Sequence, residues 1–337
     1  MIKDFYKLLK LNKLVKNHRV KFLALLLADI LGIRYLGVRF DPILGCNLRC
    51  KMCHFSNPEW REKNQGAFNQ EEVSRIAELF FDNTFQLYIG CAAEPTLYKN
   101  FTDLVKLGKD YKVPFVGFVT NGQLLNEEHI RDFIDYGLDE LTLSMHGVNK
   151  ETYENFMVNA SYQNFKKLLA SIDKIKAETN SKLPGVRLNY TVNPDNLDEL
   201  QYFFDEFGEY NISTLQVRPI MDLGDTVYKN KDMTPFISKY QEIINKLHDK
   251  CQERNITFMA NRLDPTYSEF NYSGVILDYV RRYISPQIVW QKGFDWKNEN
   301  YKEYCKRIEW RKELFKNIFT DINTIAAPSE PLSYDVD

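Results

Sequence analysis

The chain has 337 residues, of which 44% are apolar and 27% are charged, and its formal net charge is -2. A chain of this size can bury a large core, and its near-zero charge offers no general support for nucleic-acid binding. Six cysteines, three of them within residues 46–53, do not resemble a disulfide framework and favour a reducing, cytoplasmic location. No apolar run approaches the roughly eighteen residues of a membrane-spanning helix.

The first 36 residues are strongly basic. They carry eight Lys or Arg against Asp4 and Asp29, a local charge of +6 that leaves about -8 for the remainder. Residues 2–16 place apolar side chains on one helical face and lysines on the other. This amphipathic helix either brings residues 1–30 onto an anionic membrane surface or packs across the main domain with its lysines in solvent. On the first alternative, the cytoplasmic protein is membrane-associated.

From residue 37 onward, short apolar runs alternate with helical patterns, which predicts successive parallel βα units. The expected strands are 37–44, 86–90, 115–120, 140–145, 186–192 and 214–219. The helices between them are expected near 70–82, 98–110, 126–136, 161–179 and 195–207. Six such units predict an α/β fold, a partial TIM-like (β/α)6 barrel over 37–225 with its functional end at the carboxyl ends of the strands.

Beyond the barrel the pattern changes. Residues 226–320 are expected to form a mainly helical C-terminal extension, with helical patterns at 234–254 and 301–319. Residues 321–337 show no periodicity and are expected to form a loose tail. The whole chain is therefore divided into an N-terminal helical segment (1–36), a barrel, an extension and a tail.

Directly after the first expected strand, Cys46, Cys50 and Cys53 form a C-x3-C-x2-C motif. Three thiolates within eight residues can hold three irons of a cubane cluster and leave the fourth iron open. A structural zinc site would need a fourth ligand, and the nearby candidate His54 adjoins Cys53, so that joint ligation is strained. Covalent haem attachment fits Cys50 to His54, but it gives Cys46 no role and is expected in an exported protein, for which no convincing signal is present.

Other motifs follow the next strands, and together they resemble the radical S-adenosylmethionine (SAM) superfamily over about residues 37–224. The motifs are Cys46 to Cys53, Ala92-Ala93-Glu94-Pro95 after the second strand, Thr120-Asn121-Gly122 after the third, and Ser144-Met145-His146-Gly147 after the fourth. The family commonly has Gly-Gly-Glu-Pro where this chain has two alanines. The last segment is similar to the branch that carries a cysteine-rich SPASM extension. Since only Cys251 and Cys305 follow the barrel, we expect a single cluster.

The resemblance implies cofactors and ligands. Cys46, Cys50 and Cys53 would hold a [4Fe-4S] cluster whose open iron binds SAM. Glu94 would accept a hydrogen bond from the SAM ammonium group, while Ser144 would contact SAM and Asn121 would lie at its site.

An arginine that often holds the SAM carboxylate in this branch is replaced by Met157. Arg218 is the candidate substitute, with Asn189 and Thr191 as candidate ribose contacts. Each of these three can equally be a satisfied structural group. No catalytic residue is identified, but two are candidates. His146 is either a proton carrier or a turn cap, and Cys91 is either a hydrogen donor or a small buried hydrophobe.

The resemblance implies an enzyme that receives an electron from a donor such as a flavodoxin or ferredoxin and cleaves SAM to methionine and a 5′-deoxyadenosyl radical. The radical would abstract hydrogen from a carbon of a peptide, a protein or a small molecule. The alternative is a non-enzymatic iron-sulfur or zinc protein that uses the cysteine loop for electron transfer or structure. Glu94 and Ser144 discriminate between the two, because a passive metal module has no use for SAM-binding groups at strand ends.

Overall fold

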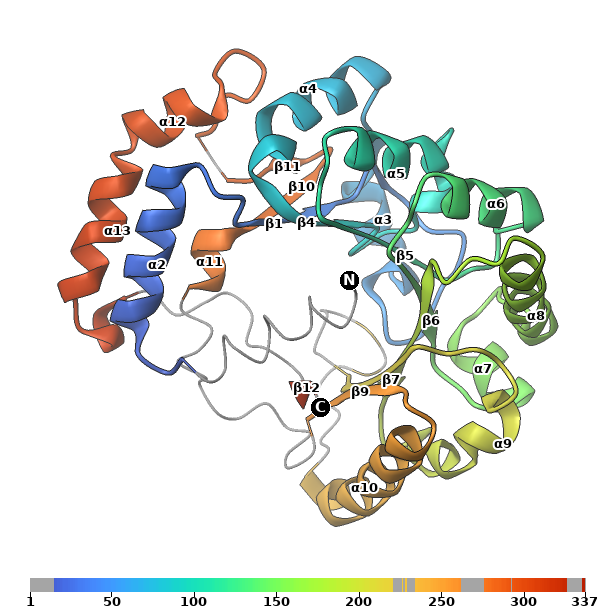
Figure 1. The fold of residues 1–337 in the computed structure, drawn as a ribbon. Helices are drawn as coiled ribbons and strands as arrows, with labels where there is room; N and C mark the ends of the chain where they lie inside the picture. The colour runs from blue at the N-terminus through green and yellow to red at the C-terminus, as the bar shows by residue number, and fades with distance from the viewer. Residues whose placement is uncertain are drawn as a thin grey trace.

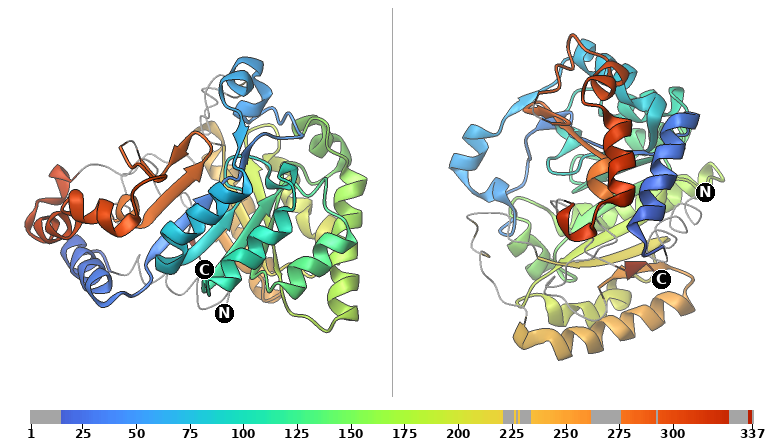
Figure 2. Two further views of the ribbon diagram at one scale, coloured as in Figure 1. Left: turned by 90° about the horizontal axis from the view of Figure 1, so that it is seen from above. Right: turned by 90° about the vertical axis from the view of Figure 1, so that its left-hand side faces the viewer.

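The computed structural model describes residues 15–220, 226, 228, 234–261, 276–291, 293–325 and 335–336. The helix expected over residues 2–16 lies almost entirely outside these ranges. Within them, helices surround one side of a curved sheet, as Figures 1 and 2 show. None of the helices in the described part of the chain is long and apolar enough to cross a membrane.

The main sheet has the strand order β11-β10-β1-β4-β5-β6-β7-β8-β9-β12. Neighbours from β10 to β9 pair in parallel, and β11 and β12 add antiparallel edges. The parallel strands are β10 (Arg281–Ser285), β1 (Leu36–Phe40), β4 (Thr84–Ile89), β5 (Phe115–Thr120), β6 (Glu140–Met145), β7 (Gly185–Val192), β8 (Thr214–Pro219) and β9 (Thr257–Ala260). The edge strands are β11 (Ile288–Val289) and β12 (Asp335–Val336).

The six predicted barrel strands are all present, and the predicted partial-barrel fold is confirmed. One difference concerns the first strand, which was expected over 37–44. It ends at Phe40, and β2 (Ile43–Leu44) instead pairs with β3 (Gly66–Ala67) in a separate small sheet. The break falls at Asp41 and Pro42, since proline has no N–H to continue the ladder of hydrogen bonds.

Helices cover the outer side of the sheet (Figure 1). In chain order they are α3 (Pro58–Lys63), α4 (Gln70–Phe80), α5 (Phe101–Asp110), α6 (Glu127–Asp135), α7 (Lys150–Phe156), α8 (Tyr162–Glu178), α9 (Phe203–Phe207) and α10 (Ile237–Glu253). Outward strand residues such as Leu87, Phe118 and Leu143 are fully buried beneath them. This apolar layer between sheet and helices is the main core of the protein.

The opposite, inner face of the sheet is polar. Register places alternate residues of neighbouring strands on this face, among them Arg39, Tyr88, Glu140, Arg187, Gln216, Arg281 and Tyr283. Glu140 of β6 accepts hydrogen bonds from Tyr88 Oη of β4 at 3.2 Å and from Arg187 of β7 at 3.2 Å. The interior of a closed barrel is normally filled by branched apolar side chains. Among the described residues, the inner face of this open sheet is therefore more polar than the interior of a closed barrel.

The C-terminal region is helical as expected, with α11 (Leu277–Val280), α12 (Tyr301–Arg307) and α13 (Trp310–Phe319) following α10. It also supplies β9 and β10, which were not predicted, and these strands extend the parallel sheet at both edges. The sequence of β10 begins with two arginines, which conceals its alternation. Arg282 is nevertheless fully buried, with its guanidinium group 4.1 Å from the ring centroid of Trp290 and 5.2 Å from that of Trp310.

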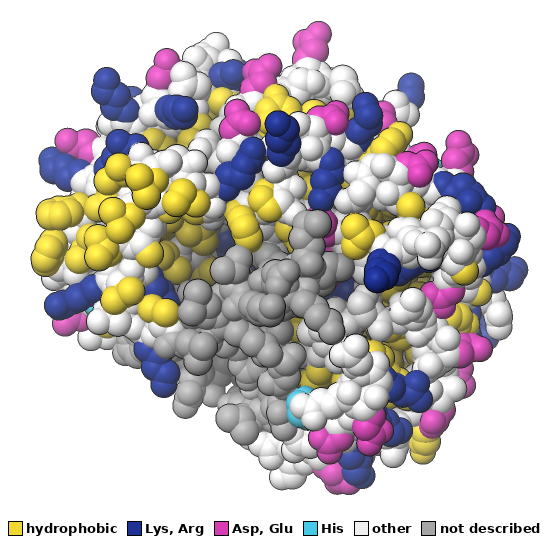
Figure 3. Space-filling model, in the orientation of Figure 1, with side chains coloured by type: hydrophobic (Ala, Val, Ile, Leu, Met, Phe, Trp, Pro, Cys, Tyr) yellow, Lys and Arg dark blue, Asp and Glu magenta, His cyan; other side chains and the backbone are white. Residues whose placement is uncertain are grey.

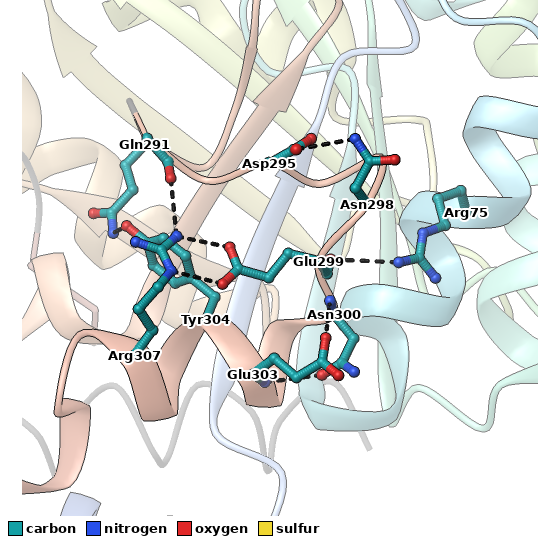
Figure 4. A network of polar contacts seen from close by, with 10 residues as sticks. Arg75, Gln291, Asp295, Asn298, Glu299, Asn300, Glu303, Tyr304 and Arg307 are labelled. Carbon is teal, nitrogen blue, oxygen red and sulfur yellow. Dashed lines mark hydrogen bonds and ion pairs between the residues drawn. The ribbon is translucent and has the colours of Figure 1, made fainter.

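A polar network attaches the C-terminal region to the barrel helices (Figure 4). Arg75 of α4 donates to the carbonyl oxygen of Glu299 at 3.3 Å, and Arg307 of α12 binds both carboxylate oxygens of Glu299 at 2.8 Å. Asn300 and Glu303 form a capping box that starts α12. The bidentate pairing fixes the orientation of α12 as well as its position.

The two ends of the described chain meet in a second, smaller core. Helix α2 (His18–Leu31) packs along α13, and Phe22, Leu25 and Leu26 lie against Trp310 and Leu314. Asp29 pairs with Arg311 at 2.6 Å. The domain boundaries expected at residues 36, 225 and 320 stay predictions.

Candidate active site

The cysteine loop lies at the carboxyl end of β1, where parallel α/β folds place their sites. Cys46, Cys50 and Cys53 are half-buried free thiols. Two backbone N–H groups of the loop, from Arg49 and Lys51, donate to the carbonyl oxygens of Val158 and Phe156 at 3.0 and 2.9 Å. The loop therefore rests on the turn that ends α7, which itself follows β6.

The three thiols lie within electrostatic range of one another. Burial raises the pKa of Cys46 to about 12. Burial, together with the neighbouring Cys53 and Cys46, raises the pKa of Cys50 well above its usual value. Burial also raises the pKa of Cys53, although the charge of Arg218 opposes this. Thiols in such surroundings become thiolates only when a bound cation compensates their charge.

This donor set fits an iron-sulfur cluster, in which each thiolate binds a different iron. Within the described ranges, no group of three or more His, Cys, Asp or Glu side chains is placed to hold a single metal ion. His54, the fourth ligand that a zinc site would have needed, packs on Trp60 with 3.8 Å between ring centroids.

Glu94 is a buried carboxylate that joins three segments of the site. Its Oε1 accepts from the hydroxyl groups of Thr96 and Thr120 at 2.6 and 2.7 Å, and its Oε2 accepts from the backbone N–H of Asn121 at 2.8 Å. Its own N–H donates to the carbonyl oxygen of Gly45, next to Cys46, at 2.8 Å. Burial raises the pKa of Glu94, and these donors oppose the shift. Because Oε2 has one protein donor, a lone pair remains for a ligand.

Asn121 lies against the cysteine loop, as expected. Its Nδ2 donates to Asn47 Oδ1 at 2.8 Å and lies 4.0 Å from Cys46 Sγ. The motifs that follow the first, second and third predicted strands, around Cys46, Glu94 and Asn121, therefore meet at one place. Their separate roles toward SAM stay predictions.

The sequence analysis missed Asp41, which organises the loop after β4. This buried carboxylate accepts from the backbone N–H groups of Cys91 at 2.7 Å, Ala92 at 3.0 Å and Ala93 at 3.4 Å. It also accepts from Tyr283 Oη of β10 at 2.9 Å. The available signal was an acidic residue directly at the end of a strand, but its donors lie about 50 and 240 residues away in the chain.

The two alanines that replace the family's glycines are accommodated because Gly90 adopts the left-handed conformation of this loop. Gly90 has φ +80°, whereas Ala92 and Ala93 do not have positive φ. A Cβ on Gly90 would lie 2.4 Å from the carbonyl oxygen of Val119 and 2.5 Å from Pro95 Cγ. The position in this loop that requires glycine is therefore Gly90, two residues before Ala92.

Arg218, His146 and Ser144 lie at the carboxyl ends of β6 and β8, on the side of the cysteine loop. The charge of Arg218 lowers the pKa values of both Cys53 and His146. Burial first, and Arg218 second, lower the pKa of His146 to about 4. This imidazole is half-buried, and its role as a proton carrier or as a turn cap stays a prediction. Its buried Nδ1 has no hydrogen-bond partner.

The two candidate ribose contacts lie on β7. Register places Asn189 between Ser144 and Gln216, and Thr191 beside Arg218. Both are buried, and Asn189 Oδ1 has no hydrogen-bond partner, which marks it as an acceptor that a ligand can satisfy.

The burial of Cys91 differs from the preferred expectation, and the structure also shows where Met157 lies. Cys91 is exposed, so its interpretation as a buried hydrophobe is wrong, while its role as a hydrogen donor stays open. Met157, in the place of the expected arginine, is fully buried in the main core and is separated from solvent.

A partial α/β barrel with three thiols on the loop after its first strand, and with Glu94 and Asn121 beside them, defines an iron-sulfur enzyme of the barrel type. The sequence profile described as the Radical SAM superfamily matches residues 41–207. The chain belongs to the radical SAM superfamily. Its cofactors are accordingly a [4Fe-4S] cluster and SAM.

Individual proteins agree with this assignment. Among curated relatives, two probable GTP 3′,8-cyclases are each 27% identical to this chain. The match to the protein of Saccharolobus islandicus (strain M.14.25) covers 72% of this chain and 72% of that one. The match to the protein of Saccharolobus solfataricus covers 77% of this chain and 78% of that one. Among solved structures, Streptococcus suis SuiB bound to SAM has a TM-score of 0.63 at 16% identity, covering 85% of this chain and 68% of that one. The protein anSMEcpe, with bound SAM and the Kp18Cys peptide, has a TM-score of 0.55 at 14% identity, covering 83% of each. These structures share the fold.

Proposed function

We propose that this enzyme binds SAM between its cysteine loop and the ends of β4 to β8 and abstracts a hydrogen atom from a carbon of a polar substrate. The observation that carries the proposal is the meeting of Cys46, Glu94 and Asn121 at one point of the barrel mouth. When bound, the cluster and SAM supply reductive cleavage of SAM and a 5′-deoxyadenosyl radical. A flavodoxin- or ferredoxin-like donor supplies the electron.

The residues of this chain bind the cluster and SAM and orient them. Cys46, Cys50 and Cys53 hold the cluster, and Glu94 Oε2 receives the SAM ammonium group in a charge-assisted hydrogen bond. Arg218, whose charge reaches Cys53, neutralises the SAM carboxylate in place of the missing arginine. Asn189 Oδ1, which has no partner in the protein, accepts from a ribose hydroxyl group.

The substrate class follows from the inner face of the sheet. The described residues of this face include four arginines, namely Arg39, Arg187, Arg218 and Arg281, of which Arg187 pairs with Glu140 at 3.2 Å. Guanidinium groups suit phosphate and carboxylate groups. We therefore propose a small substrate with an anionic group. GTP is the first candidate, because the curated relatives are named for a reaction of GTP. A peptide is the second, because SuiB is solved with a precursor peptide.

The test of the enzyme is anaerobic reconstitution with iron and sulfide, followed by SAM and a strong reductant. We expect the absorbance of a [4Fe-4S] cluster and formation of 5′-deoxyadenosine and methionine. Cys50→Ala should lose both signals, whereas Cys305→Ala, which removes another half-buried thiol outside the motif, should retain them. A cluster that never yields 5′-deoxyadenosine with any candidate substrate would instead support the electron-transfer alternative.

The test of the substrate class compares nucleotides, sugar phosphates, carboxylates and neutral peptides by their acceleration of 5′-deoxyadenosine formation. A deuterated substrate should transfer deuterium to 5′-deoxyadenosine. Arg39→Gln should raise KM for the anionic substrate by about tenfold or more, the loss expected for one charge-assisted contact, with a smaller change in kcat. Selective stimulation by a neutral substrate would refute the charge argument and leave the radical chemistry intact.

A further inference from the structure

The surface formed by α2 and α13 exposes a continuous group of large apolar side chains. We define this apolar face by Leu23, Leu27, Ile30 and Leu31 of α2 and by Phe315 and Phe319 of α13. Their exposed fractions lie between 45% and 69%. Figure 3 shows a yellow, hydrophobic area on the left, at the place where Figure 1 labels α2 and α13. Scattered exposed hydrophobics are normal, whereas a gathered patch marks an interaction site.

The residues of the apolar face are not the ones that pack α2 against the rest of the protein. Phe22, Leu25 and Leu26 already bury one side of α2 against α13. The exposed stripe of Val20, Leu23, Leu27 and Ile30 has 3-4-3 spacing and lies on another side of the same helix. Helix α2 is therefore apolar on two sides although it lies at the surface, and in the described part of the chain only one of these sides is buried.

Exposed basic residues beside the apolar face indicate which kind of partner binds there. Lys16 and Arg19 are exposed at the start of α2, and Lys316 is exposed on α13 beside Phe315 and Phe319. An apolar stripe bordered by Lys and Arg is the pattern of helices that lie in the interface of an anionic bilayer.

We propose that the apolar face of α2 and α13 docks this protein on an anionic lipid membrane, with its apolar side chains in the acyl boundary and the basic residues at the headgroups. A second copy of the chain fits this face less well. A two-fold interface would bring Lys16, Arg19 and Lys316 of both copies together, and their repulsion opposes pairing. The proposal concerns attachment and is independent of the reaction at the barrel mouth.

The experiment is flotation of the full-length protein with vesicles of phosphatidylcholine alone or of equal parts phosphatidylcholine and phosphatidylglycerol. We expect binding to the anionic vesicles, and weaker binding when salt is raised. The double variant Leu27→Gln/Phe315→Gln should bind at least about tenfold more weakly. The matched control Leu124→Gln/Tyr202→Gln removes residues that are exposed to a similar extent, 43% and 56%, outside the apolar face, and it should bind as the wild type does.

Three results would overturn the proposal. The first is the absence of wild-type flotation with anionic vesicles. The second is a dimer, seen by analytical ultracentrifugation without lipid, that Leu27→Gln/Phe315→Gln dissociates, because this assigns the face to a second copy. The third is complete loss of flotation on deletion of residues 1–14 together with normal flotation of the double variant, because the first residues alone would then be the anchor. Circular dichroism of each variant confirms that it is folded.

Discussion

Substitution of Gly90 by alanine tests whether the loop after β4 is shaped by a close backbone approach. With φ +80°, alanine incurs the left-handed penalty of about 1–2 kcal/mol. Its Cβ would also lie 2.4 Å from a carbonyl oxygen of β5 and 2.5 Å from the ring of Pro95, neither of which is a flexible side-chain end. Overpacking of this kind costs a further 1–3 kcal/mol, roughly. We therefore expect a total loss of about 2–5 kcal/mol of unfolding free energy.

Gly137 offers a matched control. Its φ is +76°, but a Cβ there would meet no atom within 4 Å. Gly137→Ala should lose only about 1–2 kcal/mol. Urea unfolding followed by circular dichroism, with unchanged m-values, measures both losses. Gly90→Ala should also weaken SAM binding, because Glu94 follows in the same loop. Equal losses in the two variants, with SAM affinity retained, would refute the argument from close approach.

Three further predictions concern buried charges. Arg282→Met removes the guanidinium group from the Trp290 ring and should lower the free energy of unfolding by about 1–3 kcal/mol in urea titration, and an unchanged midpoint would contradict this. Burial lowers the pKa of Lys21 from 10.5 to about 8, so the unfolded state binds more protons between these values and stability should rise with pH across this window. Lys21→Met should flatten that rise and increase the free energy of unfolding by about 1–2 kcal/mol at pH 7, measured by unfolding at several pH values. A pH dependence of stability parallel to that of the wild type would count against this prediction. Asp41→Asn replaces one carboxylate oxygen, which accepts hydrogen bonds, by an NH2 group that faces the N–H groups of the loop, and it should cost about 2–4 kcal/mol of stability. Tyr283→Phe, which removes one donor to Asp41, should cost only about 1 kcal/mol. Similar losses in these last two variants, by the same titration, would contradict the role given to Asp41.

The barrel strands and the cysteine motif were accessible from the sequence because their signals are local. Residues 115–120, 140–145 and 214–219 were predicted with the bounds that the structure has, since each is a short run of apolar residues next to turn residues. The spacing of Cys46, Cys50 and Cys53 likewise lies within eight residues, so that its chemistry needs no knowledge of the fold.

Tertiary structure alone decided the features that depend on distant segments. Strand β10 pairs with β1 across some 240 residues, and its Arg282 is buried only because three aromatic rings from other elements enclose it. Asp41 binds loop N–H groups and Tyr283, which no pattern near residue 41 reveals. The apolar face of α2 and α13 arises because one stripe of α2 is buried by a helix from the other end of the chain, and which stripe stays exposed is a property of packing rather than of periodicity.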